Sequence, residues 1–384
     1  MLDISTRKDL ERQQYRVIGS HSAVKICGWT KNMIKNKGGC YKLKFYGIMS
    51  NQCLQMTTSI SCANRCTFCW RGYKAPVSKD WKWDIDEPEF ILENSIKAHH
   101  KLLQGFGGQP ESKQMYTLSK TIKHVALSLT GEPIIYPKIN ELVDLFHKQG
   151  ISTFLVTNAQ YPEQIKDLHR VTQLYLSVDA PNKRLLKEID KPLFKDYWER
   201  LNKSLEYCAK KRDRTCIRLT IIKGMNDVEP ENYAKLILKG NPDFIEVKAY
   251  MHVGGSRERL TVEHMPWHEA IVEFSKELLK YLPDYEIVCE HVPSRVVMIA
   301  RKDFKKNGKW CTWIDFTKWQ RLIDSGKDFD SHDFLKITPE TGLSGRNIRL
   351  EVEEKIRKRL DVEKKTPKNR VFADEKTSET ELEQ

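Results

Sequence analysis

Residues 62–69 read CANRCTFC, which places Cys62, Cys66 and Cys69 with three and then two residues between them. Three thiolates within eight residues can converge on one metal centre. A structural zinc site uses four closed ligands, whereas three thiolates suit a [4Fe–4S] cluster in which one iron keeps an open position. We therefore expect these cysteines to hold such a cluster, whose open iron can bind a small molecule.

A second set of three cysteines precedes this loop. Cys27, Cys40 and Cys53 are each separated by twelve residues, and the residues between them are polar and contain glycine. This context does not suit thiols that only fill an apolar core, so the spacing predicts a second [4Fe–4S] cluster with its own open iron. The other cysteines lie in helix-like, strand-like or cap contexts, and we expect them to be core residues: Cys208, Cys216, Cys289 and Cys311.

Strand-like and helix-like stretches alternate after the cysteine-rich start and form about six βα units. Such alternation predicts a parallel sheet with right-handed crossovers. The predicted strands are 53–58, 124–129, 153–156, 174–178, 217–222 and 244–251. Beyond them we expect a hairpin at 285–301, a tryptophan-rich cap at 310–319, a charged helix at 346–360 and a disordered tail.

Polar residues follow the predicted strands where each strand ends. In a parallel barrel these carboxyl ends form one face, which hosts the functional site. The residues concerned are Glu132, Asn158, Asp179, Lys223, Lys248 and Tyr250.

The net charge of +13 is concentrated in one segment. Residues 12–79 hold 12 Lys or Arg and no Asp or Glu, whereas the rest of the chain is almost balanced, with 53 basic and 52 acidic side chains. A basic segment of this kind indicates an anionic partner such as RNA, although a solvated lysine-rich surface is the alternative. Candidate RNA-binding residues are Lys25, Lys31, Lys35, Lys37, Trp29 and Tyr73, among further aromatic residues at Tyr41, Phe45, Tyr46, Trp70, Trp81 and Trp83.

The composition excludes several classes of protein. The 384 residues are 40% hydrophobic and 30% charged, which is typical of a globular protein rather than a disordered chain. No apolar run is long enough for a membrane helix, and the N-terminus lacks the apolar stretch of a secretory signal. We therefore expect a cytoplasmic protein with no membrane partner.

The 62–69 motif, with Phe68 before its last cysteine, resembles that of the radical S-adenosylmethionine enzymes. The resemblance implies a partial (βα)6 barrel of the α/β class, with a cysteine-rich basic N-terminal extension and a C-terminal cap. It also implies that the open iron chelates S-adenosylmethionine, which an electron cleaves to a 5′-deoxyadenosyl radical. Residues 129–133 (LTGEP) resemble the family's GGEP-type segment, with Thr130 as a departure. By this resemblance the cofactor-binding residues are Gly131, Glu132, Asn158 and Ser177.

Residues 22–31, 39–42 and 45–48 resemble the tRNA 4-demethylwyosine synthases in particular. These are lyase-type tRNA-modifying enzymes that condense N1-methylguanosine, beside the anticodon of tRNA-Phe, with pyruvate to form 4-demethylwyosine. The resemblance is to a stand-alone archaeal type. It implies an external one-electron donor of the flavodoxin or ferredoxin type, and we expect a monomer.

Two ways of holding pyruvate remain open. Lys42, close to Cys40, can form a Schiff base with a ketone. Alternatively, the open iron of the second cluster chelates the 2-oxo acid with assistance from Lys42, and this is the arrangement that we favour from the sequence.

We expect four segments: the basic N-terminal part with the second cysteine triad (1–55), the barrel (56–283), the hairpin and cap (284–345), and the charged helix and tail (346–384). Two other functions remain as alternatives. One is a radical enzyme acting on a protein or small molecule, and the other is a non-catalytic zinc protein that binds nucleic acid.

Overall fold

The computed structural model describes residues 2–72, 74–108 and 112–343, which belong to one compact unit. Tyr73, the predicted helix at 346–360 and the predicted disordered tail lie outside the described residues. Within the described part, no helix is long and apolar enough to cross a membrane.

Six parallel strands form the centre of the molecule and neighbour one another in sequence order, which confirms the predicted α/β fold with a parallel sheet. They are β3 (Cys53–Thr57), β4 (His124–Leu127), β5 (Ser152–Thr157), β6 (Gln173–Ser177), β7 (Arg214–Ile221) and β8 (Phe244–Ala249). Most of their residues are buried, as expected for strands covered on both faces.

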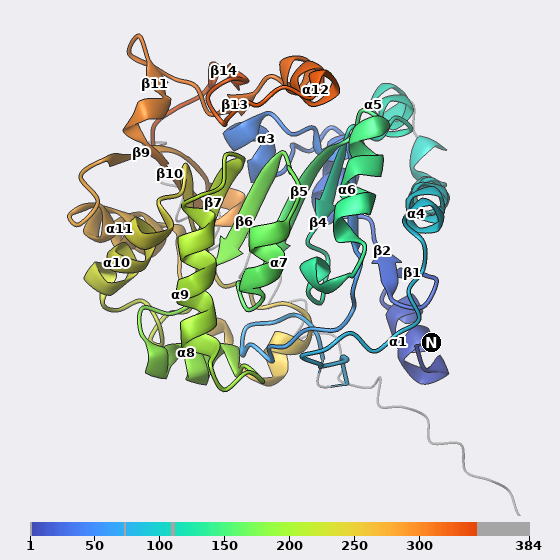
Figure 1. Cartoon of the computed structure of the whole chain (residues 1–384), viewed down its shortest axis with the longest axis horizontal. Helices are drawn as coiled ribbons and strands as arrows, with labels where there is room; N and C mark the ends of the chain where they lie inside the picture. Colours follow the sequence, from blue (N-terminus) through green and yellow to red (C-terminus); the bar gives the residue numbers. More distant parts are fainter. Residues whose placement is uncertain (1, 73, 109–111, 344–384) are drawn as a thin grey trace, which may run out of the picture. The chain divides into compact units, whose positions relative to one another are not determined.

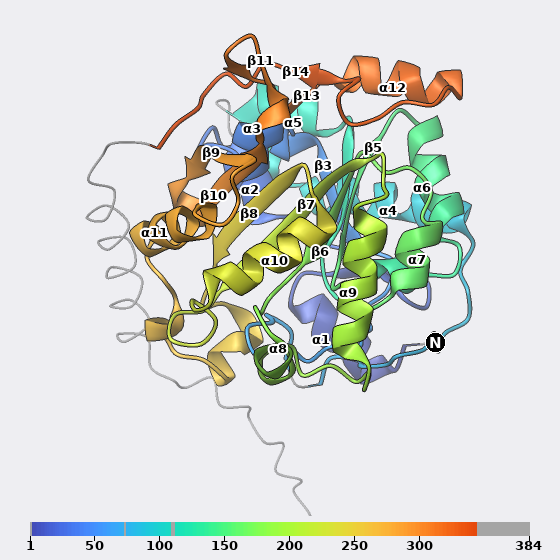
Figure 2. The ribbon, with the colours of Figure 1, turned by 60° about the vertical axis from the view of Figure 1, so that its left-hand side comes forward.

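Helices from the crossovers cover the outer face of this sheet (Figures 1 and 2). They are α4 (Pro88–Leu103), α6 (Ile139–Lys148), α7 (Pro162–Asp167), α9 (Tyr197–Cys208), α10 (Pro230–Gly240) and α11 (His268–Leu279). The sequence analysis did not include α8 (Lys183–Asp190), a helix of only eight residues, although its apolar residues Leu185, Leu186 and Ile189 recur at helical spacing and are buried.

The sheet extends beyond the barrel at both edges to ten strands. The antiparallel pair β1 (Arg16–Ile18) and β2 (Ser22–Val24) joins β3. The predicted hairpin is confirmed as β9 (Tyr285–His291) and β10 (Val296–Arg301), and β10 pairs antiparallel with β8. The sheet therefore runs without a break across the expected boundaries after residues 55 and 283.

The amino ends of the strands are closed by two segments that are far apart in sequence. One is α3 (Tyr41–Tyr46), and the other is the C-terminal cap, which contains α12 (Phe316–Ser325). Both lie at the end of the sheet where the parallel strands begin (Figure 1). Their apolar side chains share one core cluster. Arg214, the first residue of β7, donates a 2.6 Å hydrogen bond to the Thr312 carbonyl, and the Thr312 hydroxyl donates to the Phe45 carbonyl at 2.6 Å. This end of the barrel is thus packed, whereas the loops after the strands form the opposite end.

Candidate active site

The loop that carries Cys62, Cys66 and Cys69 follows β3 and is held from two sides. On one side, the backbone N–H of Arg65 bonds to the Asp190 carbonyl at 3.0 Å, at the end of α8. On the other side, the short helix η5 (Gly254–Glu258), which follows β8, brings the Gly255 N–H to 2.7 Å from the Trp70 carbonyl. Arg259 adds hydrogen bonds to the carbonyls of Thr67, Cys69 and Arg71. The loop is therefore fixed as a rigid support.

Gly131 supports the same loop by its lack of a side chain. Its φ is +68°, and a Cβ there would lie 2.0 Å from the Ser59 carbonyl oxygen. Any side chain would therefore push away the backbone that leads into Cys62. The predicted cofactor-binding residue Gly131 therefore allows its own backbone to pack closely against the backbone of residues 59–61, which leads into Cys62.

The three thiols of the loop lie together in a basic environment. Burial raises the pKa of the Cys66 thiol well above its usual value, and the neighbouring Asp190, Cys69 and Cys62 raise it further. Cys66 and Cys69 line a pocket of about 190 Å³ with four cationic side chains, which are Arg65, Arg71, Lys191 and Arg259. Three thiolates opposed by cations suit the donor set of an iron–sulfur cluster.

Within the described residues, no group of three or more His, Cys, Asp or Glu side chains is arranged to hold a single metal ion. A cluster distributes its thiolate ligands over several iron atoms, so its cysteines need not surround one point.

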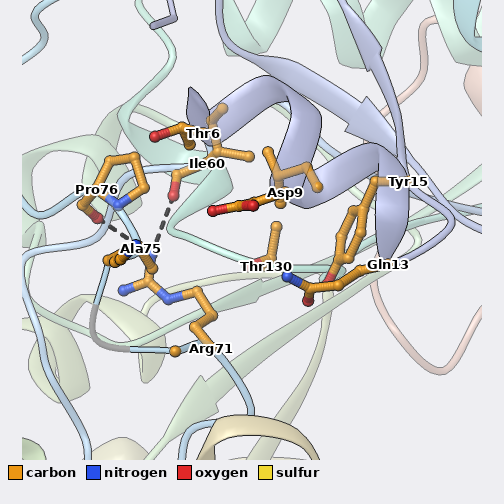
Figure 3. A pocket seen from close by; sticks show the side chains of 12 residues that line it. Thr6, Asp9, Gln13, Tyr15, Ile60, Arg71, Ala75, Pro76 and Thr130 are labelled. Atoms are coloured by element: carbon orange, nitrogen blue, oxygen red, sulfur yellow. Dashed lines mark hydrogen bonds between the residues drawn. The ribbon is translucent and has the colours of Figure 1, made fainter. Parts of the chain in front are cut away.

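Arg71 connects this pocket to a second one on the outer side of the loop. Its guanidinium donates to the carbonyls of Ile60 at 3.0 Å and Pro76 at 3.2 Å, as Figure 3 shows. Burial by itself lowers the pKa of Arg71, but the nearby sulfur atoms of Cys62 and Cys69 together raise it above its usual value, so Arg71 stays cationic. The second pocket is small, about 80 Å³, and lies against α1 (Ile4–Arg12).

Glu132 and Asn158 come together beside Cys62, although they follow different strands. The Asn158 N–H donates to Glu132 Oε2 at 2.8 Å, and Asn158 Nδ2 donates to Cys62 Sγ at 3.3 Å. Burial raises the pKa of Glu132 to about 7. Its other oxygen, Oε1, is buried without a hydrogen-bond partner. A buried acceptor without a partner beside a cysteine suits the amino group of a bound S-adenosylmethionine.

The second triad gathers at the other end of the barrel. Cys53 is the first residue of β3, and Cys40 and Cys27 immediately precede α3 and α2 (Gly28–Ile34). The pKa of Cys53 is raised to about 12, chiefly by burial. The nearby Lys42 ammonium partly offsets this increase, and the neighbouring Cys27 and Cys40 add to it. These three thiols therefore also lie close together. Because Cys53 begins the strand and Cys62 follows its end, the two triads face the barrel interior from opposite ends.

The inside of the barrel between the triads is accessible to solvent. Certain inward-facing residues of the central strands are partly exposed, whereas their neighbours along each strand are mostly buried. The partly exposed residues are Cys53, Gln55, Val156, Ser177, Arg218, Thr220 and Lys248. Ser177, predicted to bind the cofactor, thus lies on this inward, partly exposed face of the sheet.

A hydrogen-bonded charge network lies next to the second triad. Glu246 is fully buried and accepts from Arg218 Nε at 2.8 Å, Tyr46 at 3.0 Å and Tyr41 at 3.1 Å. Lys42 Nζ lies 4.4 Å from the centre of the Tyr175 ring, and the Arg218 guanidinium lies 4.8 Å from the same ring. Burial, followed by the positive charge of Arg218, lowers the pKa of Lys42.

The candidate RNA-binding lysines Lys25, Lys31 and Lys35 lie outside the barrel. Lys31 and Lys35 both lie about 6 Å from the Phe106 ring, and Lys25 lies 4.5 Å from the Tyr15 ring. Trp29 packs edge-on against His291. Of the other aromatic residues, Tyr41, Phe45 and Tyr46 are core residues, whereas Trp70, beside Cys69, is 38% exposed.

Sequence reasoning missed Asp190 and Arg259, which hold the cysteine loop. No local motif marks them, and Arg259 lies 190 residues from Cys69. Of the polar residues expected at the strand ends, Lys223 is exposed, and its backbone N–H donates to the His264 carbonyl at 2.9 Å. The four remaining cysteines are buried, as predicted.

Comparison with known proteins gives relatives along most of the chain. It is 48% identical over 357 residues to the human S-adenosyl-L-methionine-dependent tRNA 4-demethylwyosine synthase TYW1, a match that covers 91% of this chain and 49% of the human protein. The Saccharomyces cerevisiae enzyme is 45% identical over 353 residues, covering 89% of this chain and 44% of the yeast protein.

Two solved structures are also similar. The structure of a TYW1 with a lysine–pyruvate adduct bound matches this chain with a TM-score of 0.72 and 35% sequence identity. The crystal structure of an archaeal TYW1 matches it with a TM-score of 0.65 and 32% sequence identity. Each match covers 80% of this chain and 99% of the solved chain.

Family models match the radical SAM superfamily at residues 56–237 and wyosine base formation at residues 239–301. The parallel barrel and its three-cysteine loop, together with these matches, define a radical SAM enzyme. Given 35% identity over nearly all of a solved TYW1, the chain belongs to the tRNA 4-demethylwyosine synthase family. It spans about half the length of the curated relatives that it matches.

Proposed function

We propose that this chain condenses N1-methylguanosine, beside the anticodon of tRNA-Phe, with pyruvate to form 4-demethylwyosine. The observation that carries the proposal is the position of two cysteine triads at opposite ends of one solvent-accessible barrel, with Lys42 beside the second triad. One end can then serve radical formation while the other holds the co-substrate.

Two [4Fe–4S] clusters and S-adenosylmethionine are the cofactors of this proposal. Cys62, Cys66 and Cys69 hold the first cluster, and Glu132 Oε1 accepts from the amino group of S-adenosylmethionine. When bound, these groups supply a 5′-deoxyadenosyl radical that removes hydrogen from an unactivated methyl group, which no protein side chain can do. The rigid support of the loop keeps the reacting atoms in a fixed position.

Pyruvate binds covalently to Lys42 in this proposal. The Lys42 nitrogen forms a bond to the ketone carbon, and the ketone oxygen leaves as water. The lysine–pyruvate adduct in a related TYW1 supports this choice over chelation by iron alone, which we favoured from the sequence. The Cys27, Cys40 and Cys53 cluster then lies beside the adduct.

Replacing Lys42 by Ala should remove the covalent adduct. Borohydride reduces a Schiff base to a stable amine, so labelled pyruvate should mark the wild-type protein but not Lys42→Ala. The measurement is the label retained after denaturation, with the labelled residue found by peptide mass analysis. Lys44→Ala is the matched control, because Lys44 lies on the same helix and is paired with Glu340 at 3.6 Å. Equal labelling of Lys42→Ala would show that another amine forms the Schiff base, whereas no labelling of the wild-type protein would return the binding of pyruvate to the iron.

The tRNA substrate is supported by the relatives, which are tRNA-modifying synthases, and by the acid-free basic segment. An external one-electron donor, a monomeric state and a cytoplasmic location complete the proposal. The decisive experiment is anaerobic incubation with S-adenosylmethionine, pyruvate, reductant and tRNA carrying N1-methylguanosine, followed by mass analysis of nucleosides. A tricyclic product that needs all four components supports the proposal. Cofactor cleavage without any tRNA-dependent product would favour a protein or small-molecule substrate.

Binding of tRNA should weaken steeply as salt rises, because phosphate groups neutralised by lysine and arginine release their counterions. Changing Lys25, Lys31, Lys35 and Lys37 together to Gln should lower the slope of log Kd against log salt by about 0.7 to 0.9 for each phosphate that is no longer neutralised. The control neutralises four lysines that are already paired with glutamates, which are Lys97, Lys203, Lys276 and Lys280. An unchanged slope in the first variant would place the RNA on another surface.

A further inference from the structure

Lys248 is a second lysine inside the barrel, and the proposed reaction gives it no role. It lies on β8 two residues after Glu246, so both side chains point inward. Its Nζ donates only long hydrogen bonds, 3.3 Å to the Ala249 carbonyl and 3.4 Å to the Ser294 carbonyl. Among the described residues, no carboxylate lies within ion-pair distance of it. An ammonium taken from water without a counter-ion is costly, so this position favours a bound anion.

The neighbouring Arg218 guanidinium is less available to bind an anion. Arg218 already uses Nε for Glu246 at 2.8 Å and one terminal nitrogen for the Tyr41 hydroxyl at 2.9 Å. Lys42 also has no carboxylate partner among the described residues. In the proposed function, however, its nitrogen forms the covalent bond to the ketone carbon, so Lys42 is not the residue that binds the anion. Lys248 is therefore the cation of this interior whose charge remains available to a substrate.

Lys42, Arg218 and Lys248 lie around the same part of the barrel interior. Lys42 and Arg218 lie against the same Tyr175 ring, and Lys248 is paired in register with Thr220, two residues beyond Arg218. Burial and the charge of Arg218 lower the pKa of Lys248 to about 8, at which it stays mostly protonated at neutral pH. A carboxylate bound there would stabilise the charged form.

We propose that Lys248 binds the carboxylate of the 2-oxo acid while Lys42 bonds to its ketone carbon. This inference rests on the proposed function, because it takes a 2-oxo acid as the co-substrate. It makes Lys248 the residue that distinguishes a 2-oxo acid from a neutral ketone. Arg218, locked by Glu246 and Tyr41, acts as a positioning residue for both lysines.

The test measures binding of labelled pyruvate to the reconstituted holoenzyme by equilibrium dialysis, without S-adenosylmethionine or tRNA. Lys248→Met should raise the Kd for pyruvate by about tenfold or more, whereas Lys248→Arg should stay within about threefold of wild type. Pyruvamide has the same ketone without the negative charge, so wild type and Lys248→Met should bind it equally. Lys211→Met is the matched control, because Lys211 also donates to two backbone carbonyls, at 3.2 and 2.7 Å, but lies elsewhere.

Each outcome decides between the two proposals. An unchanged pyruvate Kd in Lys248→Met overturns the carboxylate role, and so does an equal loss of pyruvate and pyruvamide, which indicates structural damage. If the wild-type holoenzyme binds no pyruvate, the proposed function fails and this inference fails with it. If borohydride traps no adduct but Lys248→Met still loses pyruvate selectively, the carboxylate role stands and only the covalent bond to Lys42 is wrong.

Discussion

Replacing Cys62, Cys66 and Cys69 together by Ala is expected to reduce S-adenosylmethionine cleavage to background. The reason is that the open iron of their cluster is the only position in the proposal where the cofactor receives an electron. Iron and sulfide in anaerobically reconstituted protein should fall from about eight of each to about four, because the second triad keeps its own cluster. Metal analysis and the yield of 5′-deoxyadenosine measure the two effects.

A matched variant controls for the loss of three thiols. Cys208, Cys289 and Cys311 are buried in the core, so replacing them by Ala should leave iron content and cofactor cleavage unchanged while lowering stability. Cofactor cleavage that persists in the Cys62/Cys66/Cys69 variant would show that radical formation belongs to the other triad.

The parallel barrel could be predicted from the sequence because its strands are short apolar runs at regular intervals. The strand β7 illustrates this, since the predicted range 217–222 lies almost wholly within Arg214–Ile221. Its amino end was missed because Arg214 and Thr215 are polar, although both are buried in the structure. Their burial depends on contacts with the cap and with Asp243, which no local pattern shows.

The cysteine motifs could be recognised because their chemistry requires a fixed residue type at a fixed spacing. The supports of the motifs could not, because they come from distant segments. Asp190 reaches the loop from the end of α8, and Arg259 reaches it from the loop after β8. Glu246 likewise brings together Tyr41, Tyr46 and Arg218, which are separated by up to 177 residues. Such contacts follow from the closure of the barrel rather than from neighbouring residues.

β8 links the two functional ends of the barrel. Its residues Glu246 and Lys248 face the space beside the second triad, and the η5 segment that follows it holds the first cysteine loop through Gly255 and Arg259. One short stretch of backbone therefore joins residues beside the second triad to residues that hold the first cysteine loop. This arrangement makes it important to separate the two triads by experiment.

Replacing Cys27, Cys40 and Cys53 together by Ala should separate cofactor cleavage from product formation. One open iron cannot chelate two substrates at once, so the proposal assigns S-adenosylmethionine to the first triad and the pyruvate side to the second. The variant should still release 5′-deoxyadenosine, slowly and without coupling to formation of the tricyclic base. The reason is that the first cysteine loop is held by contacts that do not involve these three residues. It should form no tricyclic base, and its iron content should again fall to about four.

Two measurements make this expectation sharp. Nucleoside mass analysis reports the tricyclic base, and borohydride trapping with labelled pyruvate reports whether Lys42 still reacts. Because Cys40 and Cys53 lie beside Lys42, loss of the second cluster should weaken trapping as well as abolish the product. Trapping that remains intact while the product is lost assigns the second cluster to the radical step on the bound adduct. Full formation of the tricyclic base would instead remove the second cluster from the mechanism and leave Lys42, with Lys248, to hold pyruvate alone.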